Sequence, residues 1–186
     1  MKERQLGNNG FRISEVGLGC WQLGGNWGAE INKKEAYKIL NEAIDNGINF
    51  FDTADVYGDG RSEELIGAFI KASNSNVKIA TKFGRSADVF PNNYTEKALR
   101  KCVDASRKRL NKDCIDLLQL HCIPIEELKK GDIFDWLRTL KKEGKIFDIT
   151  IENMKTWHHS GFNIYCGLPI FPDDQEGIIN LARYII

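Results

Sequence analysis

Strand-like and helix-like segments alternate through most of the chain, and this alternation limits the fold more than any other feature. The expected strands are short apolar segments at 15–21, 48–52, 77–82 and 114–121. The expected helices have apolar residues at helical spacing and lie at 32–46, 61–73, 94–110 and 133–143. Units of about thirty residues in this order predict right-handed βαβ connections and a parallel sheet covered by helices.

Two architectures accommodate such a sheet: an open, doubly wound sheet and a closed (β/α) barrel. A hairpin is expected before the sheet, at 4–14, because Asn8, Asn9 and Gly10 form a turn signal. After residue 146 the pattern weakens, and the expected elements are a fifth strand at 147–151, a short helix at 153–159, a sixth strand at 162–171 and a last helix at 174–186.

Length and composition narrow the class of protein. Lys plus Arg and Asp plus Glu are both 26, so the formal net charge is zero, and neither nucleic acid nor a membrane is expected as a partner. The five cysteines are an odd number without a C-x-x-C pair, which argues against a disulfide framework and a zinc site. We therefore expect one cytoplasmic domain over 1–186 that holds no metal ion.

Four ionisable side chains stand at or just after the ends of three consecutive expected strands. Asp52 ends the second strand and Tyr57 follows it, Lys82 ends the third, and His121 ends the fourth. Each alone has a structural explanation, such as a turn cap for Asp52 or a satisfied core imidazole for His121. Together they indicate a site, because the carboxyl ends of parallel strands meet at one edge, where barrel enzymes carry out catalysis.

The chemistry of this set centres on the phenol. Tyrosine has an ordinary pKa of about 10 and is a poor acid near neutrality unless its anion is stabilised. The Lys82 ammonium would stabilise that anion, His121 could donate a hydrogen bond, and Asp52 would keep Lys82 charged and oriented. The set therefore predicts a phenol that gives a proton to a carbonyl oxygen while hydride reaches the carbon.

Several segments resemble the signature of the aldo-keto reductase family. NFFDTADVYG at 49–58 and RSEELIG at 61–67 carry most of the likeness, and VGLGCW at 16–21, IATKFG at 79–84, RLN at 109–111 and IDLLQLH at 115–121 follow in the family's order. The resemblance covers about 1–146 and implies an α/β fold of the TIM type, a (β/α) barrel. It also implies reduction of an aldehyde or ketone with NADPH, with NADH as the alternative. The implied catalytic set is Asp52, Tyr57, Lys82 and His121, with Tyr57 as proton donor.

The same resemblance implies the residues that contact cofactor and substrate. The expected cofactor-binding residues are Gly19, Cys20, Trp21, Asp52 and Thr150. The expected lining of the substrate pocket is Trp21, Tyr57, Phe83 and His121. A Rossmann dinucleotide site is excluded, because Gln22 stands where that fingerprint needs its third glycine.

The likeness fails in the last part of the chain. A complete barrel typically needs about 250 residues, whereas this chain has 186, so we expect about six of eight β/α units and a barrel truncated at its C-terminal end. Asp148 and Ile151 stand where the family has glycine and asparagine, and the residues that hold the cofactor's adenine and phosphates have no counterpart. Unpaired sheet edges then predict either self-association into a homo-oligomer or a last segment that folds back irregularly in a marginally stable protein.

Whether the chain is an active enzyme stays open on these grounds, and two rivals follow. The first is an inactive family remnant or an interaction subunit that lacks the part holding the cofactor. The second is a barrel enzyme that uses the Lys82 amine as a Schiff-base nucleophile.

Overall fold

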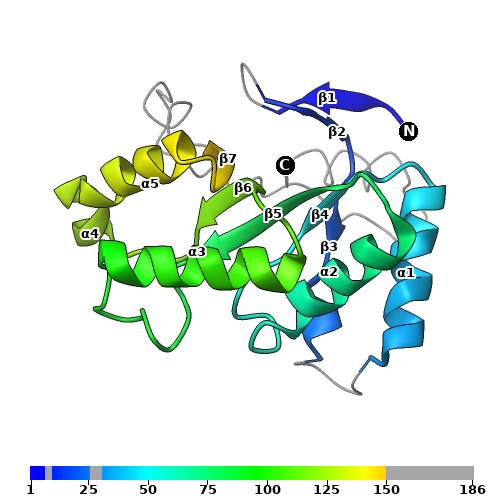
Figure 1. Cartoon of the computed structure of the whole chain (residues 1–186), viewed down its shortest axis with the longest axis horizontal. Helices are drawn as coiled ribbons and strands as arrows, with labels where there is room; N and C mark the ends of the chain where they lie inside the picture. The colour runs from blue at the N-terminus through cyan, green and yellow to red at the C-terminus, as the bar shows by residue number, and fades with distance from the viewer. Residues whose placement is uncertain (7–9, 26–30, 150–186) are drawn as a thin grey trace, which may run out of the picture.

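The computed structural model of the chain describes residues 1–6, 10–25 and 31–149 (Figure 1). Its strands are β1 (Glu3–Gln5), β2 (Arg12–Ser14), β3 (Leu18–Gly19), β4 (Phe50–Asp52), β5 (Lys78–Phe83), β6 (Ile115–Leu120) and β7 (Ile146–Ile149). Its helices are the 3₁₀ turn η1 (Trp21–Gly24) and the α-helices α1 (Lys33–Asp45), α2 (Arg61–Ser73), α3 (Glu96–Leu110), α4 (Ile125–Lys130) and α5 (Asp132–Lys142).

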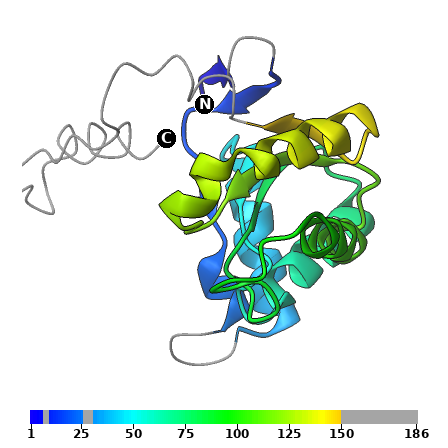
Figure 2. The ribbon, with the colours of Figure 1, turned by 90° about the vertical axis from the view of Figure 1, so that its left-hand side faces the viewer.

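The order of the strands decides between the two expected architectures. The sheet runs β3-β4-β5-β6-β7, all parallel, so that each strand pairs with its neighbour in the chain. A doubly wound sheet would reverse its order at a switch point, whereas a barrel adds strands in sequence. Figure 2 shows α1, α2, α3 and α5 following one another in an arc around the sheet. The described residues therefore form part of a (β/α) barrel, as expected.

Local capping explains where the long helices begin and end. Asn32 accepts a hydrogen bond from the backbone N–H of Glu35, and the Glu35 carboxylate accepts one from the backbone of Asn32, which closes a capping box at the start of α1. At the start of α3 the Thr95 hydroxyl oxygen accepts a hydrogen bond from the backbone N–H of Ala98. Asn111 ends α3 in the left-handed conformation, at φ 53°, which Asn tolerates better than most residues.

The core lies between the sheet and the helices, in two clusters. The first, beneath α3 and α5, includes Phe83, Leu99, Leu118 and Leu137, and the second, beneath α1 and α2, includes Leu40, Phe51, Ile66 and Ile79. On β5, Ile79 and Phe83 belong to these clusters. Because successive side chains of a strand alternate between faces, Lys82 points to the opposite, inner face.

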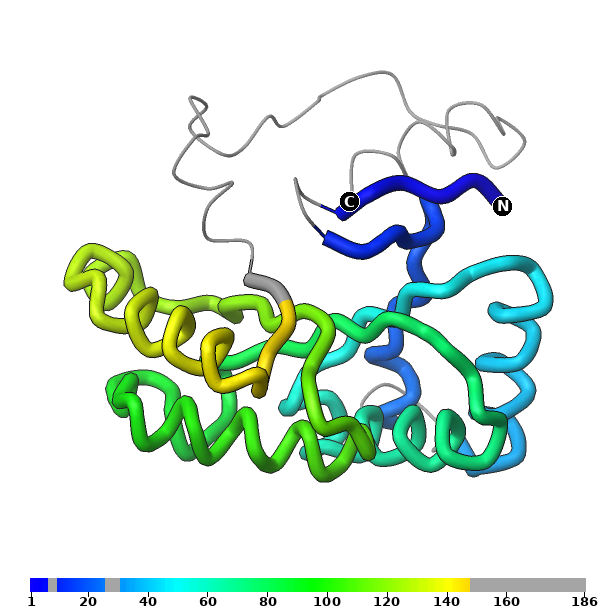
Figure 3. The backbone as a smooth tube through the Cα atoms, turned by 45° about the horizontal axis from the view of Figure 1, so that its top comes forward, coloured from blue at the N-terminus to red at the C-terminus, as the bar shows by residue number. Residues whose placement is uncertain are grey.

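The N-terminal hairpin covers the end of the sheet at which the strands begin. Ser14 and Asn49 exchange two hydrogen bonds, of 2.7 and 3.1 Å, just before β4. At the other side of the sheet, the ring of Phe11 packs 5.6 Å from the ring of Phe147 on β7. The hairpin therefore spans the sheet from β4 to β7 at its amino end (Figure 3), opposite the edge where the expected site residues lie.

Some elements differ from the sequence expectation. The expected strand at 15–21 is reduced to Leu18–Gly19, because the glycine-rich turn begins at once and carries Trp21 into η1. The short helix α4 was not expected. The fifth strand is present as β7, whereas the elements expected at 153–159, 162–171 and 174–186 lie outside the described residues. In the described part of the chain, each helix is too short or too polar to cross a membrane.

Candidate active site

The carboxyl ends of β4 and β5 bring three of the expected residues into direct contact. Asp52 is the last residue of β4, and Lys82 is the second-last of β5. The Lys82 ammonium donates hydrogen bonds to Asp52 Oδ2 at 2.8 Å, to the backbone oxygen of Thr53 at 2.8 Å and to the Tyr57 hydroxyl oxygen at 3.2 Å. The ion pair expected between Asp52 and Lys82 is therefore present, and the tyrosine oxygen lies on the same ammonium group.

Tyr57 is held there by the loop between β4 and α2. Its backbone N–H donates to the backbone oxygen of Ala54 at 3.1 Å, and its backbone oxygen accepts from the backbone N–H of Ser62 at 3.2 Å. Gly58, at φ +62°, lies so close to Gly24 of η1 that a Cβ there would stand 2.1 Å from the Gly24 oxygen. Only glycine fits this contact, which locks the backbone beside the phenol against η1.

The surroundings of Lys82 disfavour the Schiff-base rival. Its side chain is only 14% exposed, and its nitrogen lies 4.8 Å from the centre of the Tyr57 ring. An ammonium group has three N–H donors, and the three hydrogen bonds above use all of them. A nucleophilic amine would have to give up the ion pair with Asp52 and its two other hydrogen bonds.

His121 joins the site from the end of β6. Its ring meets the Tyr57 ring edge-on, with the centroids 6.3 Å apart and the planes at 84°. Burial lowers the pKa of this imidazole below 6.5, and the positive charges of Lys82 and Arg85 lower it further. The imidazole is therefore neutral near pH 7. Its Nδ1 is buried without a hydrogen-bond partner among the described residues.

Gln119 is a polar residue of this edge that the sequence reasoning missed. It pairs in register with Lys82 across β5 and β6, and its Oε1 is buried without a partner in the part of the chain that the structure describes. A signal for it was available, because Gln119 and His121 are two residues apart and so share the inner face of the strand. A buried polar atom without a partner costs free energy and marks a place for a donor.

The first strand and η1 supply an aromatic wall. The Trp21 ring is centred 6.4 Å from the Tyr57 ring, and Trp21 is 38% exposed. Gly19, at the end of β3, has open space where a Cβ would stand. Cys20 is different: its thiol is buried, its N–H donates to the backbone oxygen of Asp52, and its oxygen accepts from Ser62. Burial also raises the pKa of its thiol.

Two expected site residues are not brought to this edge. Phe83 was expected in the substrate pocket, but it is 1% exposed and lies in the core cluster beneath α3 and α5. The expectation was wrong for a simple reason: Phe83 follows Lys82 directly, so it points to the opposite face of β5. Thr150, expected to bind the cofactor, lies outside the described residues.

Comparison with known proteins agrees with the geometry. The model of the Aldo/keto reductase family matches residues 15–161. The uncharacterized oxidoreductase YqkF of Bacillus subtilis is 39% identical over 150 residues, which are 78% of this chain and 47% of that protein. The L-galactose dehydrogenase of Arabidopsis thaliana is 37% identical over 147 residues, 76% of this chain and 45% of that protein. The chain thus spans about half the length of these curated relatives.

Solved structures give the same result. The aldo-keto reductase AKR11C1 of Bacillus halodurans, in its holo form, superposes with a TM-score of 0.69 at 32% identity, over 80% of this chain and 49% of that one. A putative aldo-keto reductase from Pseudomonas aeruginosa superposes with a TM-score of 0.70 at 32% identity, over 79% and 57% of the two chains. Because the family model matches residues 15–161, most of this chain, the chain belongs to the aldo/keto reductase family.

Proposed function

We propose that this protein is an oxidoreductase that reduces the carbonyl group of an aldehyde or ketone with a nicotinamide cofactor, NADPH in preference to NADH. The observation that carries the proposal is the hydrogen bond from the Lys82 ammonium to the Tyr57 hydroxyl oxygen. An oxygen that accepts a hydrogen bond from an ammonium keeps its own proton available for donation to a second partner. In this protein we infer that the second partner is a carbonyl oxygen.

The roles of the four residues follow from their contacts. Tyr57 gives its proton to the carbonyl oxygen, and the Lys82 ammonium stabilises the negative charge left on the phenol. Asp52 and the Thr53 oxygen orient the ammonium and keep it charged. We propose that the neutral imidazole of His121, which lies edge-on to the phenol, donates a hydrogen bond to the same carbonyl oxygen. Trp21 is proposed to form one wall of the substrate pocket, beside the Tyr57 ring.

The described residues fit a nicotinamide group at this edge. When bound, a reduced nicotinamide supplies hydride to a carbonyl carbon. The buried Gln119 oxygen offers an acceptor without a partner in the described ranges, and Gly19 leaves backbone open at the end of β3. We propose that Gly19, Trp21 and Asp52 hold the ring, together with Thr150. For Cys20 we propose a supporting role only, since its backbone groups and thiol face the protein.

The test is Tyr57→Phe in the full chain. We expect this variant to lose carbonyl reduction by about 10³-fold, because the phenol is the acid, while NADPH binding, followed by the cofactor's fluorescence, stays within about twofold. Tyr37→Phe is the matched control, because Tyr37 packs on Phe69 at the helix side of the sheet and should leave turnover unchanged. Unchanged turnover in Tyr57→Phe would sink the mechanism.

A second candidate function rests on a different relative. The probable voltage-gated potassium channel subunit beta of Arabidopsis thaliana is 34% identical over 152 residues, 73% of this chain. As the second candidate we propose an interaction subunit whose barrel binds a partner protein and reduces no carbonyl. The NADPH titration separates the two candidates: binding together with reduction supports the enzyme, whereas absence of both favours the subunit.

A further inference from the structure

A buried carboxyl group lies close to the candidate active site and takes no part in it. Asp55 is only 7% exposed, and neither of its carboxylate oxygens has a side-chain hydrogen-bond partner among the described residues. The backbone N–H groups of Val56 and of Asp55 itself favour its charged form only in part. Burying a carboxylate without hydrogen bonds costs several kcal/mol, so such groups are rare outside functional sites. Asp55 stands two residues before Tyr57, in the same loop.

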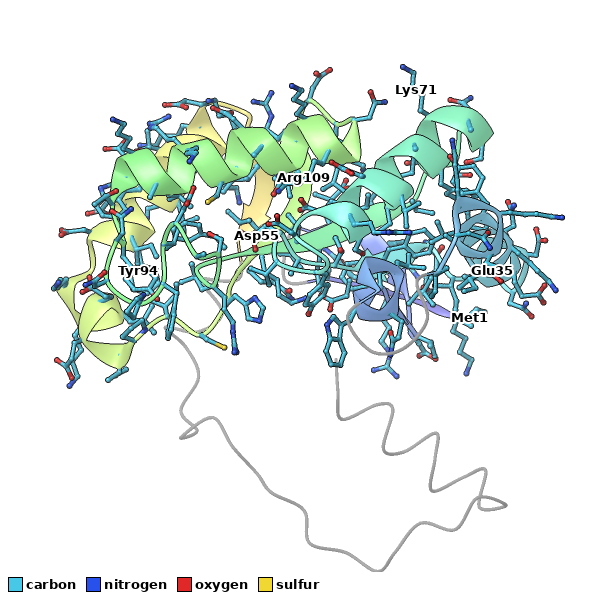
Figure 4. The ribbon with its side chains drawn as sticks, turned by 90° about the horizontal axis from the view of Figure 1, so that it is seen from below. Met1, Glu35, Asp55, Lys71, Tyr94 and Arg109 are labelled. Atoms are coloured by element: carbon cyan, nitrogen blue, oxygen red, sulfur yellow. The ribbon has the colours of Figure 1, made fainter. Side chains whose placement is uncertain are left out.

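The groups around Asp55 come from two helices. Glu63 of α2 is fully buried, and it accepts hydrogen bonds from Thr81 of β5 and, at 2.7 Å, from the Arg109 guanidinium of α3. In Figure 4, Arg109 extends from the end of α3 toward the loop of Asp55. Burial raises the pKa of the Cys102 thiol, also on α3, and the Asp55 charge raises it further. Asp55 therefore lies within electrostatic reach of one carboxyl group, one guanidinium and one thiol.

On balance, these surroundings disfavour the ionised form of Asp55. Burial and the Glu63 carboxyl group raise the pKa of Asp55 from 3.8 to about 6, and Arg109 lowers it in part. Both Glu63 oxygens already have donors, so the single guanidinium is shared unequally between two carboxyl groups. Arg109 bonds Glu63, and its charge also favours the ionised form of Asp55.

Arg109 also packs against the loop itself. A Cβ at Gly60 would stand 2.7 Å from Arg109 Cδ, so the arginine side chain lies directly on the loop backbone. On the other side, Gly58 rests against Gly24 of η1. The backbone that follows Tyr57 is thus held between η1 and Arg109.

We propose that Asp55 is a positioning residue for Tyr57: with Glu63 and Arg109 it holds the loop between β4 and α2, and gain or loss of its proton shifts the phenol relative to Lys82. The proposal rests on the proposed function, because it gives Tyr57 the role of proton donor. The ionised form of Asp55 is the one that fixes the phenol for proton transfer, since it adds a second attraction between the loop and Arg109.

The first test follows Tyr57 directly, without cofactor or substrate. The protein is labelled with 3-fluorotyrosine at its five tyrosines, and Tyr57→Phe assigns the Tyr57 fluorine resonance. His121 is a second titratable group and lies edge-on to Tyr57, and burial lowers its pKa, so the pH series is recorded in a His121→Asn background. We expect the Tyr57 resonance to move with a midpoint near pH 6. A resonance that stays fixed between pH 5 and 7.5 overturns the proposal.

The second test compares two carboxylates that stand two positions before and two positions after Tyr57 in the sequence. Asp55→Asn should abolish the movement of the Tyr57 resonance near pH 6. It should also lower kcat at pH 7.5 by about tenfold while KM stays within about twofold, because misplacing the acid slows proton transfer more than it weakens substrate binding. Asp59→Asn removes an exposed carboxylate two residues after Tyr57, at φ 53°, which Asn adopts readily, and should change neither. Equal kcat in Asp55→Asn and the unmodified protein overturns the proposal.

The two tests keep the proposals apart. If the Tyr57 resonance titrates and no carbonyl is reduced, the proposed function fails while the link between Asp55 and Tyr57 stands. If carbonyls are reduced and the Tyr57 resonance does not change with pH, the link between Asp55 and Tyr57 fails while the proposed function stands. An unfolded Asp55→Asn variant leaves the first test intact, because the His121→Asn protein keeps Asp55.

Discussion

Two neighbouring residues of β5 point to opposite faces of the sheet, and each contacts an ion pair. The two ion pairs have very different surroundings. On the inner face, Lys82 pairs with Asp52 and also bonds the Tyr57 hydroxyl oxygen. On the outer face, Thr81 donates to Glu63, which pairs with Arg109. The inner carboxylate is partly open to solvent, whereas Glu63 is fully covered by α2 and α3.

The difference in burial assigns different roles to the two ion pairs beside β5. An ion pair at an open edge contributes little to folding but remains available to a reacting molecule. A buried pair is costly to break, because removal of one partner leaves an uncompensated charge in the interior. We therefore expect the inner pair to govern the rate of reaction and the outer pair to govern the stability of the loop that carries Tyr57.

The largest effect is expected from removal of the inner cation. Lys82→Met should lower kcat for carbonyl reduction by about 10³-fold, because the phenol loses the charge that stabilises its anion. The free energy of unfolding should change by less than about 1 kcal/mol, since the Asp52 carboxylate left behind reaches solvent. Steady-state kinetics and urea unfolding measure the two quantities. If Lys82→Met kept its kcat but unfolded at a much lower urea concentration, the inner ion pair would govern stability and not the reaction rate.

Removal of the outer cation should act first on stability, and it should also loosen the loop that carries Tyr57. Arg109→Met leaves the buried Glu63 carboxylate without its partner and should cost about 3 to 5 kcal/mol of unfolding free energy. Arg100→Met is the control on the same helix: Arg100 pairs with Glu96 and Glu143 at the surface, so its loss should leave stability nearly unchanged. Equal urea midpoints for the two variants would contradict the comparison.

The sequence predicted the inner face better than the outer one. Asp52, Lys82 and His121 are polar endings of apolar strands, and local pattern alone places such residues at the carboxyl edge. The helices were placed within a few residues, because caps such as Asn32 and Thr95 are local signals. Phe83 was misplaced only because the alternation of strand side chains was not applied to the residue after Lys82.

The outer face depends on contacts that no local pattern contains. Glu63 and Arg109 are 46 positions apart in the sequence, and they meet only because α2 packs on α3. The unpartnered state of Asp55 is likewise a property of the folded surroundings, since the same residue in a turn would be hydrated. Long-range electrostatics of this kind requires coordinates.

Asp55 gives the outer face a dependence on pH. The folded protein holds the Asp55 proton up to about pH 6, whereas the unfolded chain releases it near 3.8. Between these values the folded state binds more protons, so the Asp55 contribution to stability falls as pH rises and is lowest above pH 6. A shift of about two pKa units corresponds to a penalty of about 3 kcal/mol at most.

Asp55→Asn should remove that penalty. Relative to the unmodified protein, we expect the variant to gain up to about 3 kcal/mol of unfolding free energy at pH 8, and clearly less at pH 4.5, where Asp55 is already neutral in the folded state. Urea unfolding at the two pH values measures the difference. Asp88→Asn removes an exposed carboxylate held by Lys101 and should show no such gain at pH 8. A variant that is destabilised more at pH 8 than at pH 4.5 would contradict the sign.

The smallest effect tests how the two faces are joined through β5. Thr81→Val keeps the shape of the side chain but removes the donor to Glu63 Oε1, and should cost about 1.5 to 2 kcal/mol, because the acceptor is charged and buried. Glu63 keeps Arg109, so the loop stays clamped and kcat should remain within about twofold. Thr139→Val, whose hydroxyl bonds an exposed backbone oxygen on α5, should cost less. If Thr81→Val instead lowered kcat as strongly as Asp55→Asn, the strand itself would transmit the position of Glu63 to Lys82, and the separation of rate from stability between the two faces of β5 would not hold.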